Sequence, residues 1–354
     1  MSSLLAQTLS EIQLADQQCR ADAVAHIHDL TMPDWALGRL LDLAVDLAGM
    51  TRDLRIPVSR KEIVLMAGDH GIVAEGVCPQ PSCVTAQMVR NFCNGGGGIG
   101  VLSDLAHAHV TLVDIGVASD LEALPIEHCK IAYGTNNFAR GPAMSREQAI
   151  ASLETGIRLT QRLADDGVQV FATGEMGIGN TSPATAILTV LLGETDPAPY
   201  VGPGAGLPLD RLAHKAEVIR HGIALNCPNP HAPLDVLAKV GGFEIGGLAG
   251  VILAAASRHK PVLVDGFIST AAALLAASLS PASKDYMILA HGSAEPAHAK
   301  MAAFLGKRPL LDLNLRLGEG TGAALAMPLL DAASAIMNRM STFSQANVTT
   351  EGIR

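Results

Sequence analysis

The chain of 354 residues has few aromatic side chains, which make up only 3% of it. Hydrophobic residues nevertheless account for 49% of the sequence, so the core must be built mainly from Ala, Leu, Val and Ile. This length suffices for one large domain, or for a large domain with a small one.

The chain also lacks any block of basic residues. Its 25 Lys and Arg are outnumbered by 34 Asp and Glu, which gives a net charge of −9. Nucleic-acid binding requires clustered Lys and Arg that neutralise phosphates, so the sequence argues against a nucleic-acid partner. A small anionic substrate remains compatible with this charge, because helix N-termini and one lysine can hold a single phosphate.

None of the six cysteines forms a CxxC pair or a zinc-ligand set, which predicts reduced thiols in a cytoplasmic protein. The N-terminus has no basic segment followed by a continuous apolar stretch, so we expect no signal peptide. The apolar runs 248–256 and 271–279 are too short to span a membrane, and we predict that they form buried helices.

Short apolar strands alternate with helices from residue 61 onward. The predicted strands are 63–67, 110–114, 168–172, 261–264 and 286–290. Longer helical stretches such as 146–165 and 209–225 separate them. This alternation predicts an α/β fold with a doubly wound, mostly parallel sheet and helices on both faces.

Both ends of the chain have a helical pattern instead. We predict that residues 1–60 and 330–354 together form a small helical domain. The large α/β catalytic domain would then comprise residues 61–329.

Every predicted strand ends in a polar residue close to a glycine. The five strand ends contain Asp69 and His70, Asp114, Glu175, Asp265, and His291 with Ser293. In open parallel sheets, ligands bind beyond the carboxyl ends of the strands. The sequence therefore predicts one binding site at this edge of the sheet.

The most informative segment is Gly174-Glu175-Met176-Gly177-Ile178-Gly179-Asn180-Thr181, between a predicted strand and a predicted helix. Its glycines allow the backbone to approach a ligand. We expect Thr181 or Ser182 to cap the helix, whose free N–H groups favour an anion. The carboxylate of Glu175 inside such a loop indicates chemistry beside a phosphate.

A second carboxylate, Glu319, also lies between glycines, just before the apolar run 323–330. A helix-capping carboxylate is the structural alternative for both glutamates. Two such segments in one chain favour a shared pocket, in which an ionised carboxylate serves as a general base.

Two further glycine-rich segments have different interpretations. Gly202 and Gly204, followed by Lys215, indicate a second backbone cradle with a cation for phosphate, although a solvated lysine on a helix face is the alternative. The run 95–100 matches G-x-G-x-x-G but follows a helical rather than a strand pattern. We therefore interpret it as a tight connection between helices rather than as a dinucleotide site.

His291, Glu295 and His298 invite a metal interpretation, but Pro296 interrupts their helical spacing and no fourth ligand is apparent. We therefore predict no metal and favour Ser293 as a donor to phosphate or ribose. The strand-end residues Asp69, His70, Asp114 and Asp265 remain open between structural and functional roles. A metal-dependent hydrolase using Asp69, His70, His291, Glu295 and His298 is the alternative enzyme.

Taken together, these segments resemble the nicotinate-nucleotide–dimethylbenzimidazole phosphoribosyltransferase family, which makes α-ribazole phosphate for the lower ligand of cobalamin. The resemblance covers about residues 30–345. The matching stretches are AGDHGI (67–72), VTAQMVRNF (84–92), VDIGV (113–117), GEMGIGNTS (174–182), VGPGAG (201–206), DGFI (265–268), HGSAEPAH (291–298) and LGEGTGAALA (317–326).

The resemblance implies a homodimer without a cofactor, acting on nicotinate mononucleotide and a benzimidazole-type base. It implies that Glu319 is the general base and that Glu175 assists it. The implied phosphate and ribose contacts are Gly174, Met176, Gly177, Ile178, Gly179, Asn180, Thr181, Gly202, Gly204, Lys215, Ser293 and Gly320. The implied contacts to the base are Gln80, Ser82, Gln87, Met88 and Leu317.

Several positions depart from the family pattern, among them Gln80 in place of a tyrosine, Asn136 in place of an arginine and Ala205 in place of a threonine. Dimethylbenzimidazole is the default acceptor, while purines, other benzimidazoles and phenolic acceptors stay open. A nucleotide- or base-binding protein that has lost catalysis is the alternative that is not an enzyme. The two carboxylates in glycine-rich loops argue against this alternative, because a protein that only binds its ligand does not need them.

Overall fold

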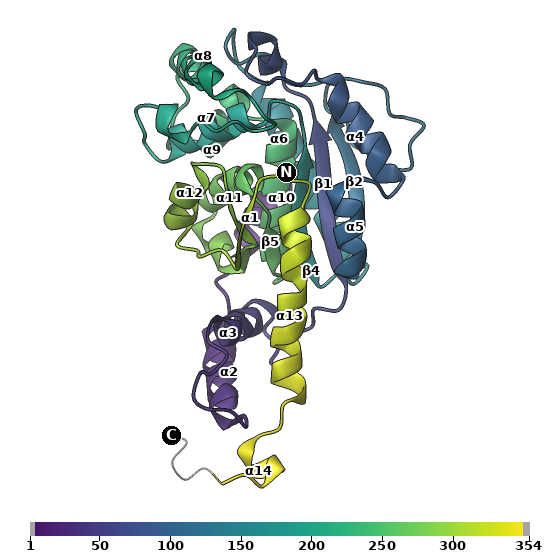
Figure 1. Ribbon diagram of the computed structural model, residues 1–354, viewed down its shortest axis with the longest axis vertical. Helices are drawn as coiled ribbons and strands as arrows, with labels where there is room; N and C mark the ends of the chain where they lie inside the picture. Colours follow the sequence, from purple (N-terminus) through teal and green to yellow (C-terminus); the bar gives the residue numbers. More distant parts are fainter. Residues whose placement is uncertain (1–3, 350–354) are drawn as a thin grey trace.

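The computed structural model describes residues 4–349. Its centre is a sheet of six parallel strands in the order β3-β2-β1-β4-β5-β6 (Figure 1). These strands are β1 (Lys61–Gly68), β2 (Ala108–Gly116), β3 (Glu127–His128), β4 (Val170–Met176), β5 (Val262–Val264) and β6 (Met287–Leu289). A separate parallel pair consists of β7 (His291–Ser293) and β8 (Leu311–Leu315).

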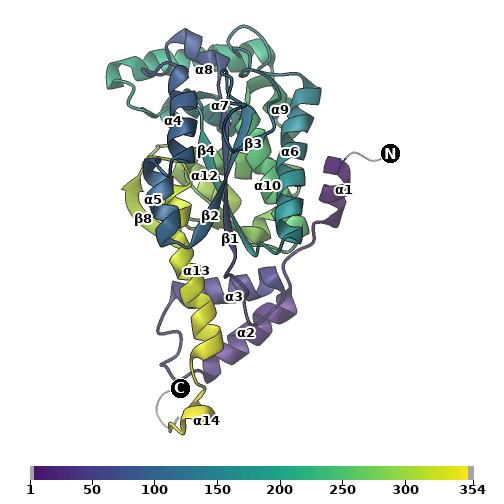
Figure 2. The ribbon, with the colours of Figure 1, turned by 90° about the vertical axis from the view of Figure 1, so that its right-hand side faces the viewer.

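Helices cover both faces of the sheet, which Figure 2 shows nearly edge-on. One face carries α4 (Cys83–Cys93), α5 (Gly97–Leu105) and the start of α13 (Thr321–Arg339). The other carries α6 (Arg146–Asp165), α10 (Phe243–Ser257) and α11 (Phe267–Leu279). Outside α11 lie α7 (Thr181–Leu191), α8 (Leu212–Asn226), α9 (Pro233–Val240) and α12 (His298–Leu305). The predicted α/β class with helices on both faces is confirmed.

All five predicted strands are present, as β1, β2, β4, β5 and β6. Every residue of β1 is buried, as expected for a central parallel strand covered on both faces. The prediction missed β3 and the pair β7–β8. β3 has only two residues, and β7 reads His-Gly-Ser, so neither presents an apolar run.

Glycines let α6 and α10 pack backbone against backbone. A Cβ at Gly156 would lie 1.9 Å from the carbonyl oxygen of Gly247, and one at Gly250 would lie 2.0 Å from that of Leu153. All residues of α10 are buried, and so is most of α11. The apolar runs 248–256 and 271–279 are therefore buried helices, as predicted.

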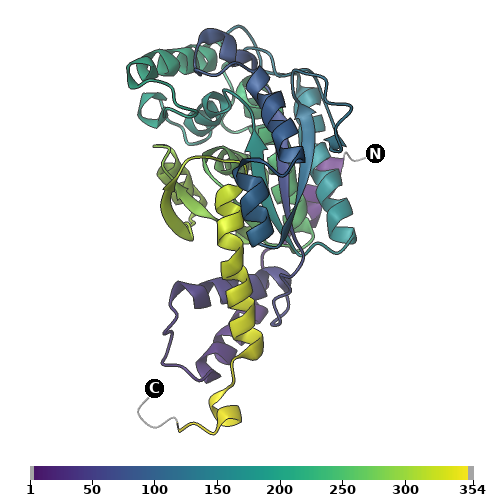
Figure 3. The same ribbon diagram turned by 45° about the vertical axis from the view of Figure 1, so that its right-hand side comes forward.

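The N-terminal helices divide between two places. The first, α1 (Leu4–Glu11), packs on α6 and α10, whereas α2 (Gln17–Asp29) and α3 (Arg39–Thr51) pack with α13 below the sheet (Figure 3). The helix α13 runs through residue 330 and is followed by α14 (Phe343–Ala346). The division into domains at residues 60 and 330 stays a prediction. Within residues 4–349, no helix combines the length and apolar character that crossing a membrane requires.

Candidate active site

The sheet changes winding direction at β1, which has β2 on one side and β4 on the other. Such a switch point opens a crevice beyond the carboxyl ends of the strands. A cavity of about 470 Å³ lies there. Most of the predicted site residues line it: Gln80, Met88, Glu175, Met176, Gly177, Ile178, Asn180, Thr181, Gly204, Ser293, Leu317 and Glu319.

The remaining predicted residues do not line this cavity. Gly174, Gly202 and Lys215 lie behind its wall and contact residues that do line it, while Gly320 follows the lining residue Glu319 in the chain and packs against Ile63 and Gly174. Gly179 has a left-handed backbone with φ of 90° and abuts Val73. Ser82 directly precedes α4, and Gln87 is an exposed residue of that helix. Neither residue lines the cavity, so their contact with the base stays a prediction.

Glu175 lies at the end of β4 and is buried. The side-chain amide of Asn180 donates a hydrogen bond to its Oε2. Burial raises the pKa of Glu175 to about 8, and the charges of Asp265 and Glu244 add to this rise, while Asn180 and the backbone N–H of Glu319 oppose it. Burial therefore favours the protonated form of Glu175.

Glu319 lies in a turn of left-handed backbone between β8 and α13. The φ angles of Gly318, Glu319 and Gly320 are 83°, 62° and 84°. The backbone N–H of Ile99 donates a 3.3 Å hydrogen bond to Oε2 of Glu319. Burial raises the pKa of Glu319, and the N–H groups of Ile99 and Gly98 oppose this rise.

The glycine run 95–100 has a role that the sequence did not reveal. It connects α4 to α5, as predicted, but it also brings the N-terminus of α5 against Glu319. A Cβ at Gly97 would lie 3.3 Å from Oε2 of Glu319, and one at Gly98 would lie 3.4 Å from the same atom. A side chain at either position would crowd the carboxylate.

The backbones that carry the two glutamates are in direct contact. A Cβ at Gly174 would lie 2.8 Å from the carbonyl oxygen of Glu319, and one at Gly318 would lie 2.2 Å from Oε1 of Glu175. Glycines at these two positions therefore let both carboxylates face a single cavity. Neither glutamate serves only as a side-chain cap, since both line that cavity.

Lys215 of α8 is buried behind the loop that ends at Thr181. Its Nζ donates to Oγ1 of Thr181 at 2.7 Å and to the carbonyl of Gly202 at 3.0 Å. Burial lowers the pKa of Lys215 to about 8, and the nearby charge of Glu295 opposes the fall. The alternative of a solvated lysine on a helix face is wrong.

The prediction that Thr181 or Ser182 caps α7 is also wrong. The residue before α7 is Asn180, and no side chain makes a capping hydrogen bond there. Thr181 instead accepts from Lys215, and Oγ of Ser182 is buried. The N–H groups at the start of α7 therefore keep no side-chain acceptor, which suits an anion at this end of the helix.

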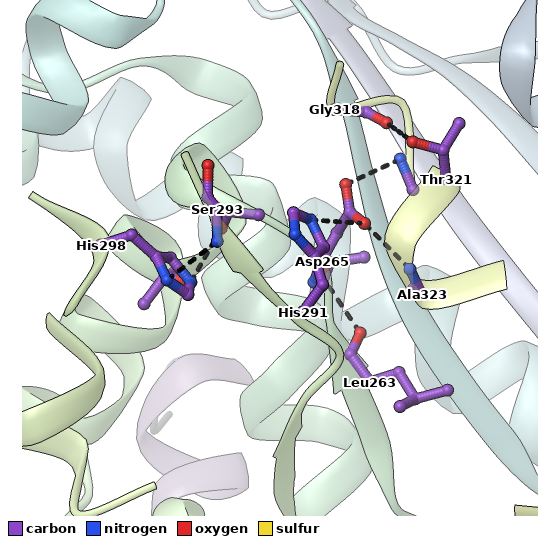
Figure 4. A network of polar contacts seen from close by, with 12 residues as sticks. Leu263, Asp265, His291, Ser293, His298, Gly318, Thr321 and Ala323 are labelled. Atoms are coloured by element: carbon purple, nitrogen blue, oxygen red, sulfur yellow. Dashed lines mark hydrogen bonds and ion pairs between the residues drawn. The ribbon is translucent and has the colours of Figure 1, made fainter. Parts of the chain in front are cut away.

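The three histidines of the metal interpretation have separate partners, and Figure 4 shows those of His291 and His298. His291 faces Asp265 at 3.6 Å, and Nδ1 of His298 accepts from the backbone N–H of Ser293 at 3.3 Å. His70 pairs with Glu244 at 2.8 Å. Across residues 4–349, no group of three or more His, Cys, Asp or Glu is arranged to hold a metal ion.

Apolar side chains line the part of the cavity next to α4. Val84, Met88, Met176 and Leu317 contribute to it, and Gln80 adds a polar amide. Val84 was not predicted, although it lies one helical turn before Met88, and that spacing was a usable signal. Arg316 and Phe267 were also missed, because only the fold brings them to this cavity.

Comparisons with known proteins establish the class. A family model described as a phosphoribosyltransferase matches residues 12–348. The nicotinate-nucleotide–dimethylbenzimidazole phosphoribosyltransferase of Syntrophotalea carbinolica is 54% identical over 98% of this chain and 99% of its own length. That of Desulfotalea psychrophila is 50% identical, with the same coverage.

Solved structures agree. The crystal structure of the corresponding enzyme from Thermus thermophilus matches with a TM-score of 0.89 at 40% identity, over 94% of this chain and 99% of that one. A structure described as CobT from the same organism gives a TM-score of 0.90 at 41% identity, with the same coverage.

The fold, the site and these matches define a phosphoribosyltransferase. Within that class, the chain belongs to the nicotinate-nucleotide–dimethylbenzimidazole phosphoribosyltransferase family, which confirms the resemblance seen in the sequence. The predicted enzyme class and its place in the synthesis of the lower ligand of cobalamin are confirmed with it.

Proposed function

We propose that the chain transfers the 5-phosphoribosyl group of nicotinate mononucleotide to a benzimidazole-type base, with Glu319 as general base and Glu175 assisting. The observation that supports these roles is the placement of both carboxylates on one cavity, on backbone segments in direct contact. The donor and acceptor named for the relatives fit a pocket with a phosphate-type end and an apolar end.

The reaction builds positive charge on the sugar carbon C1′, so it needs negatively charged groups close to that carbon. Nicotinate leaves C1′ with the electron pair of the broken C–N bond, and oxocarbenium character develops on the ribose. Preorganised carboxylates stabilise such a charge. The pKa of Glu175, about 8, is that of the ligand-free site, and the cationic pyridinium of the donor favours its ionised form.

The acceptor must lose a proton. One benzimidazole nitrogen attacks C1′ with its lone pair, and Glu319 takes the proton from the other nitrogen, which leaves a neutral base in the product. Burial raises the pKa of Glu319 towards the working range of a general base. Attack on the face opposite the departing nicotinate inverts C1′ and gives the α-riboside.

The phosphate end is formed by backbone and one ammonium group. Lys215 supplies positive charge from behind Thr181, which lines the cavity and is the first residue of α7, so the N-terminus of this helix lies at the cavity wall. Ser293 and Gly204 line the cavity nearby and are the proposed contacts to phosphate and ribose. Gly174, Gly179, Gly202 and Gly320 would contribute by allowing the close backbone approach.

Incubation of the enzyme with nicotinate mononucleotide and a panel of bases tests this function. We expect nicotinate release only when an acceptor base is present, with an α-riboside product identified by mass and anomeric NMR. Nicotinate release without any acceptor would contradict the transfer. Loss of activity after chelation would favour the metal-dependent hydrolase instead, and tight base binding without nicotinate release would favour a protein that only binds.

The same panel addresses the acceptor. Gln80 adds an amide to a cavity that the apolar side chains of Met88 and Leu317 also line. We propose dimethylbenzimidazole as the default acceptor, with Gln80 as the residue that modifies the preference. Replacing Gln80 with Leu should increase turnover of dimethylbenzimidazole relative to adenine, and unchanged ratios would remove Gln80 from this role.

We further propose a homodimer in the cytoplasm. Large apolar side chains are exposed on α5 and around β8, namely Val101, Leu105, Leu313 and Leu317. An exposed group of this kind suits a subunit contact. Light scattering of the purified protein measures the oligomeric state, and a monomer at micromolar concentration would contradict the proposal.

A further inference from the structure

Asp265 contacts the turn that carries Glu319 but does not line the cavity itself. It follows β5 and is 1% exposed. Oδ2 accepts a hydrogen bond from the backbone N–H of Gly320 at 3.1 Å. Oδ1 accepts one from the backbone N–H of Ala323 at 2.9 Å, which Figure 4 shows. One carboxylate thus holds the residue next to Glu319 and the first turn of α13.

The turn requires such support because three consecutive residues have left-handed backbone, with φ of 83°, 62° and 84° at Gly318, Glu319 and Gly320. A glutamate is strained in this region, whereas glycine is not. Strained backbone persists only where surrounding contacts hold it. Without the hydrogen bonds from Gly320 and Ala323, we expect Glu319 to relax away from its position.

Asp265 is itself anchored to the strand that carries the other glutamate. Its backbone N–H donates to Oγ1 of Thr173 in β4 at 3.2 Å, two residues before Glu175. The residue therefore connects the Glu175 strand to the Glu319 turn. His291 of β7 completes its surroundings, with Nε2 at 3.6 Å from Oδ1.

We propose that Asp265 is a positioning residue, which fixes the Glu319 carboxylate at the reacting base by holding the turn through two backbone hydrogen bonds. This inference rests on the proposed function of Glu319. Both backbone partners can only donate, so the ionised carboxylate, which only accepts, is the form that matches them. Burial raises the pKa of Asp265, and His291 and the N–H groups of α13 oppose this rise.

The charge of Asp265 has a second effect that separates this role from simple stabilisation of the fold. It raises the pKa of Glu175 and of Glu319. The other charged group that raises the pKa of Glu175 is Glu244 of α10. Removing the charge of Asp265 should therefore lower the pKa of both cavity glutamates.

The test is Asp265→Asn, which keeps the size of the side chain but replaces one acceptor oxygen with a donor. We expect kcat to fall about 10- to 100-fold, as for a small misplacement of a reacting group. We also expect the KM for nicotinate mononucleotide to stay within about twofold of the wild-type value, because the substitution leaves the proposed contacts to the bound nucleotide unchanged. The acidic limb of the pH–rate profile should move to lower pH.

Asp114→Asn is the matched control. Asp114 is also 1% exposed, lies in β2 of the same sheet, and accepts from the backbone N–H of Val117 at 2.9 Å. It does not line the cavity. We expect this variant to keep kcat and the pH–rate profile, whatever happens to its melting temperature.

A folded Asp265→Asn variant with unchanged kcat would overturn the proposal. An equal loss of kcat in Asp265→Asn and Asp114→Asn, with no shift in the pH–rate profile of Asp265→Asn, would overturn it as well. Should Asp265→Asn not fold, Thr173→Val removes the acceptor for the backbone N–H of Asp265. We then expect a smaller loss of kcat at unchanged KM, and wild-type kcat in that variant would overturn the proposal.

Glu319→Gln is measured beside these variants. Wild-type turnover in Glu319→Gln would contradict the general-base role and, with it, the positioning role. Collapse of turnover in Glu319→Gln together with full activity in Asp265→Asn would contradict the positioning role alone.

Discussion

The backbone N–H of Ile99 lies 3.3 Å from Oε2 of Glu319, although the two residues are 220 positions apart in the chain. The contact places the N-terminus of α5 against the proposed general base. A helix N-terminus favours negative charge, so it stabilises the ionised form of the glutamate that must accept a proton. Burial acts in the opposite direction and raises the pKa.

Replacing Glu319 with Gln should remove the proton acceptor while leaving the cavity shape intact. We expect kcat to fall by about 10²- to 10⁴-fold, the usual contribution of a general base. Steady-state kinetics and calorimetric binding of nicotinate mononucleotide measure the two effects separately. Glu122→Gln, at an exposed residue, is the control and should behave as wild type. An equal loss of nucleotide affinity would show a structural rather than a catalytic defect.

The α5 contact with Glu319 predicts a difference between two glycines of the same run. Gly95 and Gly97 both have left-handed backbone, with φ of 72° and 77°, so an alanine at either costs about 1–2 kcal/mol of stability. A Cβ at Gly97 would also lie 2.6 Å from Phe92 and 3.3 Å from Oε2 of Glu319, whereas one at Gly95 meets nothing within 4 Å.

We therefore expect Gly97→Ala to lose activity and Gly95→Ala to keep most of it. The melting temperature should fall further in Gly97→Ala, because only its Cβ also meets Phe92. Thermal unfolding and kcat of the two variants provide the comparison. Equal activities would show that the N-terminus of α5 does not influence Glu319.

Lys215 predicts a pH dependence of donor binding. Its pKa of about 8 means that the ammonium is charged below pH 8 and loses its charge above it. The affinity for the phosphate of nicotinate mononucleotide should therefore decline by up to about tenfold per pH unit above 8. Calorimetric titrations between pH 7 and pH 9.5 measure this decline.

Lys215→Met should bind the nucleotide about 10- to 100-fold more weakly and without this pH dependence, as expected for losing a charged hydrogen bond. Lys239→Met is the control, because Lys239 forms a partly exposed ion pair with Asp235. An unaltered pH dependence in Lys215→Met would assign the titration to another group.

Asn180 predicts a shift of opposite sign to that of Asp265. Its hydrogen bond lowers the pKa of Glu175, so Asn180→Ala should raise that pKa above about 8. Since the proposed mechanism uses ionised Glu175, the acidic limb of the pH–rate profile should move to higher pH. Activity lost at pH 7 should then recover partly at pH 9.

Asn338→Ala removes an amide hydrogen bond from α13 to the carbonyl of Arg55, in the connection between α3 and β1, and serves as the control. Its pH–rate profile should match that of the wild type. A profile for Asn180→Ala that shifts to lower pH would contradict the electrostatic assignment.

Much of the fold was predictable because its signals are local. The apolar run in β1 and the helix from Arg146 to Asp165 are visible in the pattern of neighbouring residues. The strand β7 was not, because His-Gly-Ser carries no strand pattern, whereas the alternation Leu-Asp-Leu-Asn-Leu in β8 was a usable local signal that the prediction missed. The prediction that Thr181 caps α7 was wrong because of a contact between residues far apart in the chain: Lys215 of α8 donates a hydrogen bond to the hydroxyl group of Thr181.

The sequence by itself determined the α/β class, the strand ends that carry polar residues, and the two glycine-flanked glutamates, because each is encoded within a few adjacent residues. Only the tertiary structure decided that Ile99 and Asp265 support Glu319, that Lys215 is buried behind Thr181, and that the histidines have separate partners. These contacts join residues that are far apart in the chain. They arise from the packing of helices and strands, which no local pattern specifies.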